Sequence, residues 1–183
     1  MNYFLLGGVG LLSILIILIA NWLIKTYNFF VYNRIKVDEK WAQIEVALKK
    51  KYDMVPAIAD TVKGYVKHEK GTLSEVTELR SQWGKAKNIP EKLSLSNALD
   101  AALGKLMAVI EKYPQLKADR HFLDLQRQIR RVENEIGHYR KDYNRRVSKY
   151  NRRIEFFPNN LVAKKFGFEK RAFYSITSDE TSE

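Results

Sequence analysis

The sequence predicts an all-α membrane protein, in which an N-terminal transmembrane helix is followed by an antiparallel up-and-down four-helix bundle. Three observations carry this prediction: an uncharged apolar run that opens the 183 residues, apolar residues at helical spacing in the remainder, and four prolines spaced widely between these stretches. Alternating β-branched residues and Asn-Gly or Asp-Gly hairpin turns are missing from the sequence. Helices joined by short loops pack as an antiparallel bundle.

The apolar run extends from Phe4 to Ile24 and reads FLLGGVGLLSILIILIANWLI. As a helix it would span roughly 31 Å, which matches a bilayer core of about 30 Å. Trp22 and Tyr27 stand where an aromatic belt would meet one interface. A cleaved signal peptide is the alternative, but such a peptide begins with basic residues, and no Lys or Arg precedes the run. We therefore expect a membrane anchor marked by Phe4, Trp22 and Ile24.

Charge predicts which side of the membrane the domain occupies. All 32 Lys and Arg and all 21 Asp and Glu lie from Lys25 onward, so the net charge of +11 belongs to the domain. Cationic residues that flank a membrane helix stay on the cytoplasmic side. The predicted protein crosses the cell membrane once, with its N-terminus outside and its bundle in the cytoplasm.

Composition leaves little for catalysis or metal binding. The chain has no cysteine, which excludes disulfides, thiolate metal sites, a cysteine nucleophile and a lipoprotein anchor. His68-Glu69 lacks the second histidine of a zinc-protease motif, and His121 and His138 would lie about 25 Å apart on one helix. Neither a Gly-x-Ser-x-Gly elbow nor a nucleotide-binding loop is present. We expect no enzymatic activity, no cofactor and no metal.

An apolar stripe at helical spacing runs through the first half of the domain. Its members are Trp41, Leu48, Val55, Val62, Val76 and Trp83, with Ile44, Ile58, Tyr65 and Leu79 three residues on. The stripe stays in phase across Pro56, so it fits either one long helix kinked there or two helices that turn at residues 51–53, with Asp53 as the N-cap of the second. We expect the turn, because a straight helix over residues 31–87 would be about 85 Å long, more than such a domain can cover.

Two further helices complete the predicted bundle. One covers residues 92–113, between an Asn88-Ile89-Pro90 turn and Pro114. The other covers residues 122–157 and has the most regular apolar spacing, in a stripe that begins at Phe122 and ends at Phe157. The acidic, polar end of the chain predicts a disordered tail. The predicted boundaries are an anchor over 1–24, a bundle over 25–157, an aromatic and basic segment over 158–174, and the tail over 175–183.

Short motifs occur in a specific order along nearly the whole chain. In the first half they are Tyr27-Asn28, Val37-Asp38-Glu39 before Trp41, residues 48–56 (LKKKYDMVP), and Val62-Lys63-Gly64-Tyr65 before His68-Glu69-Lys70. In the second half they are residues 113–118 (YPQLKA), Glu133-Asn134, residues 140–144 (RKDYN), Tyr150-Asn151, Phe157-Pro158, Ala163 and Phe166-Gly167-Phe168. In order and spacing these motifs resemble the LemA family of bacterial single-pass membrane proteins.

The resemblance implies one transmembrane helix with a short outer N-terminus, followed by an up-and-down four-helix bundle, in agreement with the residues. It implies no activity and supplies no catalytic residues. Departures from the family pattern are mild: Lys50 and Lys51 stand where arginines are usual, Asp119 where Asn is common, and Tyr139 where a small residue is usual. Only Tyr139 is expected to change packing near the motif.

Asn144 and Asn151 are seven residues apart on the last predicted helix, and each follows a tyrosine of its apolar stripe. Buried asparagines that pair with each other or with a neighbouring helix fix helix register at some cost in stability. We expect such a register network at these two residues. A polar binding groove that includes Arg140 and Asp142 is the alternative.

The end of the last predicted helix is strongly basic, and in an up-and-down bundle it returns to the membrane. Its cations are Arg140, Lys141, Arg145, Arg146, Lys149, Arg152 and Arg153, followed along the chain by Lys164, Lys165, Lys170 and Arg171. This cluster is the candidate lipid or partner surface; nucleic acid is disfavoured, because no recognition motif accompanies the charge. Four later aromatic residues would either dip into the lipid interface or cap the bundle: Phe166, Phe168, Phe173 and Tyr174.

Two functions fit these features. The first is an interaction or scaffold protein that docks a partner protein at the cytoplasmic face of the membrane. The alternative is a self-assembling, membrane-organising protein that binds anionic lipid through the basic helix end. Discrete complexes with another protein favour the first, and large homo-oligomers favour the second.

Overall fold

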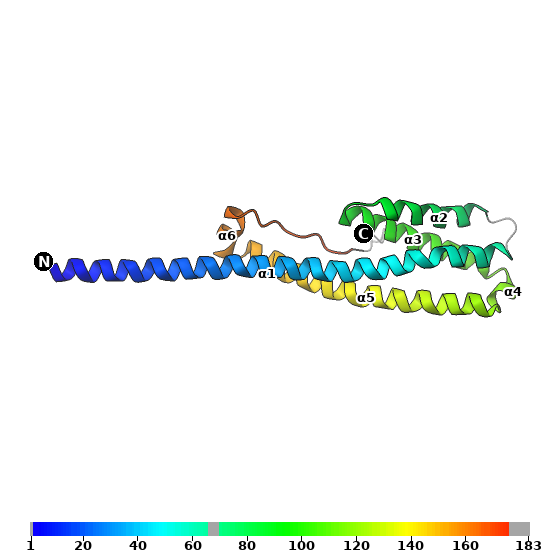
Figure 1. Ribbon diagram of the computed structural model, residues 1–183, viewed down its shortest axis with the longest axis horizontal. Helices are drawn as coiled ribbons and strands as arrows, with labels where there is room; N and C mark the ends of the chain where they lie inside the picture. The colour runs from blue at the N-terminus through cyan, green and yellow to red at the C-terminus, as the bar shows by residue number, and fades with distance from the viewer. Residues whose placement is uncertain (1, 66–69, 176–183) are drawn as a thin grey trace, which may run out of the picture. The chain divides into compact units, whose positions relative to one another are not determined.

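The computed structural model describes residues 2–65 and 70–175 of the chain, and of residues 2–6 and 70 only the backbone. Six helices occupy this part, and no strand occurs in it, which confirms the all-α class. The helices are α1 (Asn2–Lys63), α2 (Lys70–Lys85), α3 (Ile89–Ile110), α4 (Pro114–Lys117), α5 (Arg120–Glu155) and α6 (Asn159–Lys165) (Figure 1). The chain divides into two compact units: the first comprises residues 1–40 and 142–173, and the second residues 41–141 and 174–183.

The turn that the sequence predicted at residues 51–53 does not form, because α1 continues through it as far as Lys63. Asp53 is therefore an exposed residue inside a helix, where it pairs with Lys49 at 2.9 Å, and it is not an N-cap. Pro56 also lies inside α1. The anchor and the first helix of the bundle are thus one continuous helix, and the first break in the chain comes after residue 63.

Packing explains why α1 continues through a proline. A proline in a helix interior costs about 3 kcal/mol, because a backbone hydrogen bond is lost and the ring clashes with the preceding turn. On either side of Pro56, however, the side chains of Tyr52, Val55, Ile58 and Val62 are almost completely buried. Each contributes on the order of 1.5–3 kcal/mol by leaving water, so their combined burial outweighs the cost of the proline.

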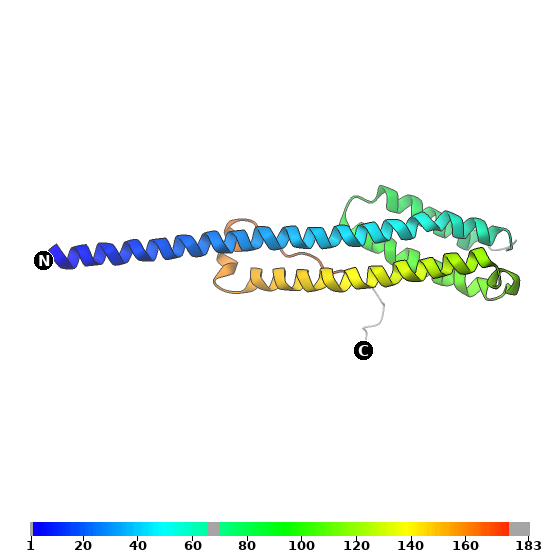
Figure 2. The same cartoon turned by 60° about the horizontal axis from the view of Figure 1, so that its bottom comes forward.

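The second unit is the four-helix bundle. Its helices alternate in direction along the chain: the second part of α1, then α2, α3 and the first part of α5 (Figures 1 and 2). Its core is aliphatic with a few aromatic residues, among them Leu99, Leu103, Leu106, Ile129 and Phe122. The predicted up-and-down bundle is confirmed.

Helix α3 is long and apolar enough to cross a membrane by length and composition alone. Its apolar residues Leu99, Leu106 and Ile110 are instead buried in the core of the second unit. The helix begins where the sequence predicted a turn, since the side chain of Asn88 caps it by accepting a hydrogen bond from the backbone N–H of Glu91 at 2.9 Å. Helix α3 is therefore a core helix of the bundle.

The first unit contains the beginning of α1 and the end of α5, which lie side by side (Figure 2). It also contains α6 and the extended segment of residues 167–173. On α1, Thr26, Phe30, Asn33 and Val37 are buried at spacings of four and three, which is one helical face. These residues are the contribution of α1 to the buried interior of the first unit.

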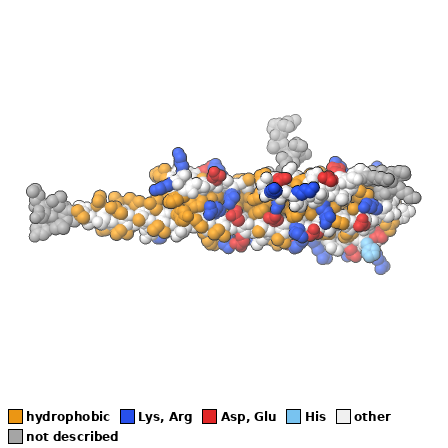
Figure 3. Space-filling view, turned by 45° about the horizontal axis from the view of Figure 1, so that its top comes forward, with side chains coloured by type: hydrophobic (Ala, Val, Ile, Leu, Met, Phe, Trp, Pro, Cys, Tyr) orange, Lys and Arg blue, Asp and Glu red, His pale blue; other side chains and the backbone are white. Residues whose placement is uncertain are grey.

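The N-terminal part of α1 is covered by apolar side chains all round. Its most apolar 18-residue window has a mean hydropathy of 2.3 and none of its residues is buried within the structure. Figure 3 shows hydrophobic side chains along this part of α1, whereas basic and acidic side chains are mixed over the rest of the visible face. A helix that exposes apolar residues on every side is suited to lipid, and the N-terminal part of α1 is the transmembrane anchor that the sequence predicted.

Candidate interaction surface on helix α5

A stripe of tyrosines fixes which way the end of α5 faces. Tyr143, Val147 and Tyr150 are buried at spacings of four and three, and the ring of Tyr150 meets that of Phe30 on α1 at 6.1 Å between centroids. Burial raises the pKa of both Tyr143 and Tyr150, so their hydroxyls stay neutral. The cations between these residues are therefore outside the buried contact of α5 with α1.

The predicted basic residues divide between the two units. Arg140 and Lys141 belong to the second unit, where the guanidinium of Arg140 lies 5.6 Å from the centroid of the Tyr174 ring. The other five belong to the first unit: Arg145, Arg146, Lys149, Arg152 and Arg153. All of these except Arg146 are exposed, and Arg146 is half-buried.

Two open grooves lie on this face of the first unit. One is lined almost wholly by cations, and its residues are Arg145, Arg146, Ser148, Lys149 and Arg152. The other is lined by both aromatic and basic residues, and its residues are Phe29, Lys149, Arg152, Arg153 and Phe156. The first groove suits an acidic surface, and the second suits a ligand that combines negative charge with an apolar part.

Distances along α1 place these grooves relative to the apolar anchor. The guanidinium of Arg153 lies 5.0 Å from the ring of Phe29, which is five residues, or about 7 Å, past Ile24. Asp142 pairs with Lys40 at 3.7 Å and with Arg145 at 2.8 Å, and Lys40 lies about 24 Å past Ile24. Measured along α1, Arg153 therefore lies about 7 Å past the end of the apolar run, and Arg145 about 20 Å past it.

Asn151 bonds to the extended segment and not to a neighbouring helix. Its side-chain nitrogen donates to the carbonyl of Arg171 at 2.8 Å, and its side-chain oxygen accepts from the amide of Arg171, also at 2.8 Å. The hydroxyl of Tyr143 donates to the carbonyl of Ala172 at 2.9 Å. Asn144 is half-buried on the same helix. The predicted register network between helices is thus, at Asn151, a clasp that holds the segment against α5.

A glycine directs the chain from α6 into the extended segment. Gly167 has φ +68°, and the amide of Phe168 donates to the carbonyl of Ala163 at 2.9 Å, as in a Schellman C-cap. Phe168 then stacks on Phe30 at 5.0 Å between centroids and meets Tyr27 edge-on at 5.6 Å. The Phe-Gly-Phe motif is therefore a turn that seats one aromatic ring against α1.

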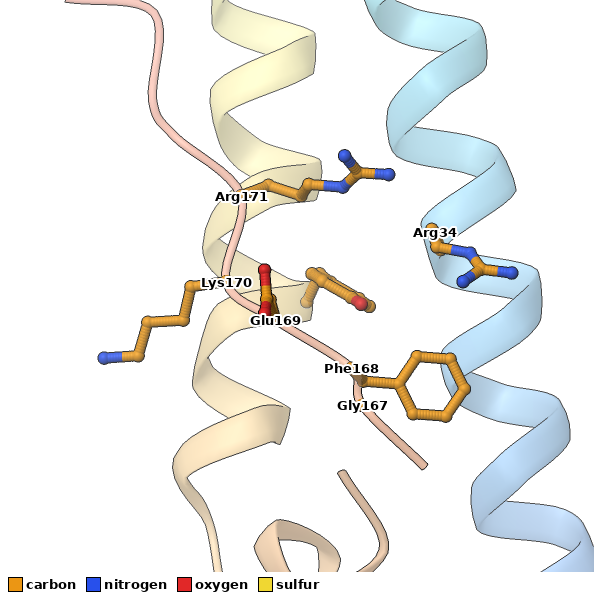
Figure 4. Close-up of a pocket in the computed structure, with 7 residues that line it drawn as sticks. Arg34, Gly167, Phe168, Glu169, Lys170 and Arg171 are labelled. Atoms are coloured by element: carbon orange, nitrogen blue, oxygen red, sulfur yellow. The ribbon is translucent and has the colours of Figure 1, made fainter. Parts of the chain in front are cut away.

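Beyond this turn the segment lines a small pocket in the first unit. Figure 4 shows Phe168 pointing toward α1, where Arg34 lies over its ring at 5.6 Å, while Lys170 points away. Arg171 pairs with Asp38 of α1 at 3.1 Å. Glu169 also lines the pocket, so its charge is mixed. The contacts of Phe168 and Arg171 hold the segment to α1.

The four aromatic residues that the sequence offered as lipid contacts behave differently from one another. Phe168 and Tyr174 are buried, and they pack against α1 within their own units, so the capping alternative holds for these two. Phe166 and Phe173 are each half exposed. Phe156 and Leu161, which were not predicted as surface contacts, are exposed, and so is Phe157, which was predicted to belong to the apolar stripe of the helix. Their position after the last buried tyrosine was the available signal.

A buried lysine of the second unit forms ion pairs with two other helices. Lys51 is 3% exposed, and its amine donates to Asp100 and, at 3.0 Å, to Glu133. Lys50 pairs with Glu135 at 3.0 Å, which lowers the pKa of that carboxyl through the hydrogen bond. These two family departures thus take part in ion pairs between helices.

Metal-binding geometry is not found in the part of the chain that the structure describes: no group of three or more His, Asp or Glu side chains could hold an ion there. His121 and His138 both lie on α5, while His68 lies outside the described residues.

A sequence model of the LemA family matches residues 40–183, which include most of the bundle, the clasp and the Phe-Gly-Phe turn. The chain belongs to the LemA family. It is 30% identical over 141 residues to Protein LemA of Metamycoplasma hominis, covering 75% of this chain and 63% of that protein. It is also 34% identical over 73 residues to the magnetosome proteins MamQ 1 and MamQ 2 of Paramagnetospirillum magneticum, covering 40% of this chain and 27% of each. This chain therefore spans less than two thirds of the length of these relatives. Family membership and the apolar start of α1 together describe a membrane-anchored helical protein.

Proposed function

We propose that this LemA-family protein is a membrane-anchored interaction module, which docks a partner protein at the cytoplasmic face of the cell membrane and has no catalytic activity of its own. The observation that carries the proposal is the cation-lined groove of Arg145, Arg146, Ser148, Lys149 and Arg152. The partner would present an acidic surface to this groove. The cations that begin at Lys25 support the cytoplasmic orientation.

The distance of Arg145 from the membrane favours a protein over lipid as the ligand of that end of the groove. The headgroup layer adds only about 5–8 Å to each side of the hydrocarbon core. Arg145 stands about 20 Å past Ile24 if α1 runs close to the bilayer normal, since Asp142 links it to Lys40. At physiological salt the attraction between charges is screened over about 8 Å, so the leaflet attracts Arg145 only weakly. A protein can reach that height.

A second candidate function, a self-assembling membrane-organising protein, is favoured by the lower part of the same face. Arg153 lies over Phe29, about 7 Å past the anchor, where anionic headgroups are within reach. Each cation near such a surface contributes on the order of 1 kcal/mol. Arg152 and Arg153 would then hold each copy to lipid while other surfaces assemble the copies.

Crosslinking from the groove distinguishes the two functions. A photocrosslinker is attached to the full-length Ser148→Cys variant, which carries the only thiol in the chain, and is activated in cells. The proposal predicts a discrete adduct with another protein, lost when Arg145→Glu and Arg146→Glu are combined and retained when Arg153→Glu and Lys164→Glu are combined. The second pair is the matched control, because it reverses the same charge at two exposed residues that do not line the groove.

Two outcomes would count against partner docking. Adducts at multiples of 21.4 kDa would favour self-assembly, above all if the Arg153 and Lys164 pair abolishes them. An adduct that both charge-reversed pairs leave unchanged would mean that the basic groove plays no part in binding. Far-UV circular dichroism of each variant establishes that the helices remain folded.

A further inference from the structure

The turn between α5 and α6 exposes large apolar side chains in an otherwise charged region. Phe157 is 78% exposed, Leu161 58% and Phe156 55%, all within six residues of the chain. Exposed apolar residues scattered singly are ordinary, but several together mark an interaction surface. Phe166, which is half exposed, lies at the other end of α6.

The contacts of the first unit place this turn at the end of the membrane anchor. Arg153 of α5 lies over Phe29 of α1, and the Phe166 ring meets Tyr27 edge-on at 5.0 Å. Because α5 runs antiparallel to α1, Phe156 comes three residues closer to the membrane than Arg153, within about 3 Å of the level of Ile24. Figure 2 shows the end of α5 and α6 beside the part of α1 that follows its apolar segment.

Cations surround the apolar side chains of this turn. Arg152 and Arg153 precede it, and Lys164 and Lys165 follow it on α6, all four exposed. Arg152 and Arg153 also share an open groove with Phe29 and Phe156. Apolar groups beside long basic side chains are the pattern of a segment that lies in the membrane interface, with its rings below the phosphates and its cations among them.

We infer that the α5–α6 turn is a second membrane contact, which inserts Phe156, Phe157 and Leu161 into the interfacial layer of the leaflet where α1 leaves the bilayer. The occupant of this surface is phospholipid, because the surface is continuous with the transmembrane segment and lies at its depth. The inference requires that α1 is a transmembrane anchor, and it does not depend on the proposed docking function. It holds on either side of the membrane and with or without a partner protein.

Accessibility of spin labels tests the inference on the full-length chain in vesicles of phosphatidylcholine and phosphatidylglycerol. A nitroxide is attached to Phe157→Cys or Leu161→Cys, and its collision rates with oxygen, which concentrates in lipid, and with a water-soluble nickel chelate are compared. The matched control is Ser148→Cys, an exposed α5 position about 13 Å farther from the membrane. We expect the ratio of oxygen to nickel collisions to be several-fold higher at residues 157 and 161 than at residue 148.

Two results would overturn the inference. Equal ratios at all three positions would place the turn in water. A label at residue 157 that is immobile and shielded from both reagents would place the turn against protein, either a second copy or a partner. The 78% exposure of Phe157 allows the label to be carried without disturbing packing, and circular dichroism of each labelled chain checks this.

Discussion

The side-chain amide of Asn151 makes two hydrogen bonds to the backbone of a single residue, Arg171, each 2.8 Å long. The amide side chain thus pairs with both backbone groups of one residue, as a neighbouring antiparallel strand would. Arg171 in turn contacts Asp38 of α1 through its guanidinium at 3.1 Å. The clasp therefore ties α5, the extended segment and α1 together within the first unit.

Removing the amide should release the extended segment. Asn151→Ala leaves the N–H and the carbonyl of Arg171 without these partners, at a cost of about 1–3 kcal/mol. We expect the amides of Arg171 and Ala172 to exchange hydrogen faster, as measured by mass spectrometry on the full-length chain in detergent. The control is Ser148→Ala, an exposed change one helical turn away. Unchanged exchange at Arg171 would show that the segment is held by other contacts.

Any residue other than glycine should strain the backbone at position 167, although space for a side chain is available. A Cβ there would meet nothing within 4 Å, but φ is +68°, which costs a residue other than glycine roughly 1–2 kcal/mol. Gly167→Ala should therefore lower the free energy of unfolding by about that amount. Gly137→Ala on α5 is the matched control and should raise it by roughly 0.5–1 kcal/mol. Urea unfolding of both variants makes the comparison, and a neutral Gly167→Ala would contradict the cap.

The continuity of α1 predicts the effect of removing Pro56. In a helix interior alanine is better than proline by about 3 kcal/mol, less roughly 0.4–1 kcal/mol for the more flexible unfolded chain. Pro56→Ala should therefore stabilise the protein by about 2 kcal/mol. Pro90→Ala, in the first turn of α3 where proline is well tolerated, should give no such gain. If Pro56→Ala were neutral or destabilising in thermal unfolding, a turn near residues 51–53 would be the better description.

The cap of α5 should make stability depend on pH. Asp119 accepts hydrogen bonds from the Phe122 amide at 2.9 Å and from the Tyr65 hydroxyl at 3.0 Å, which lower the pKa of its carboxyl below the ordinary value. A carboxyl whose pKa is lower in the folded chain contributes stability above about pH 4 and loses it as the pH falls through the folded value. Asp119→Asn keeps an acceptor at the cap without this titration. Melting temperatures from pH 6 to pH 3 should fall more steeply for the parent than for the variant, and parallel curves would exclude the effect.

Much of the fold could be predicted because local signals agreed with the tertiary structure. The apolar run to Ile24, the Asn88-Ile89-Pro90 turn and the stripe of α5 each indicate an element that forms. The turn at residues 51–53 was wrong because it was inferred from the excessive length of an unbroken helix over residues 31–87. Helix α1 instead ends at Lys63, and packing on both sides of Pro56 favours the helix. Helix propensity is a property of each residue by itself, whereas the burial of a whole helix face stabilises all the residues of the helix together.

The candidate surface was less predictable. The basic residues of α5 could be identified from composition, but their division by depth along α1 depends on which residues meet across helices, such as Arg153 with Phe29. The partner of Asn151 lies 20 residues away in a segment with no periodicity, so no spacing rule could identify it. Phe157 read as a core residue because the helical repeat continues to it after the helix itself has ended.

The most direct test of the proposed function is to determine on which side of the membrane the bundle lies. Because the chain has no cysteine, Ser81→Cys places a single thiol on the exposed face of α2, and Asn2→Cys places one before the anchor. Intact spheroplasts are treated with a membrane-impermeant maleimide before and after lysis. A cytoplasmic interaction module predicts that residue 81 is labelled only after lysis, while residue 2 is labelled in the intact cell. Labelling of residue 81 in intact cells would contradict the proposed docking site, because the basic groove would then face away from every cytoplasmic partner.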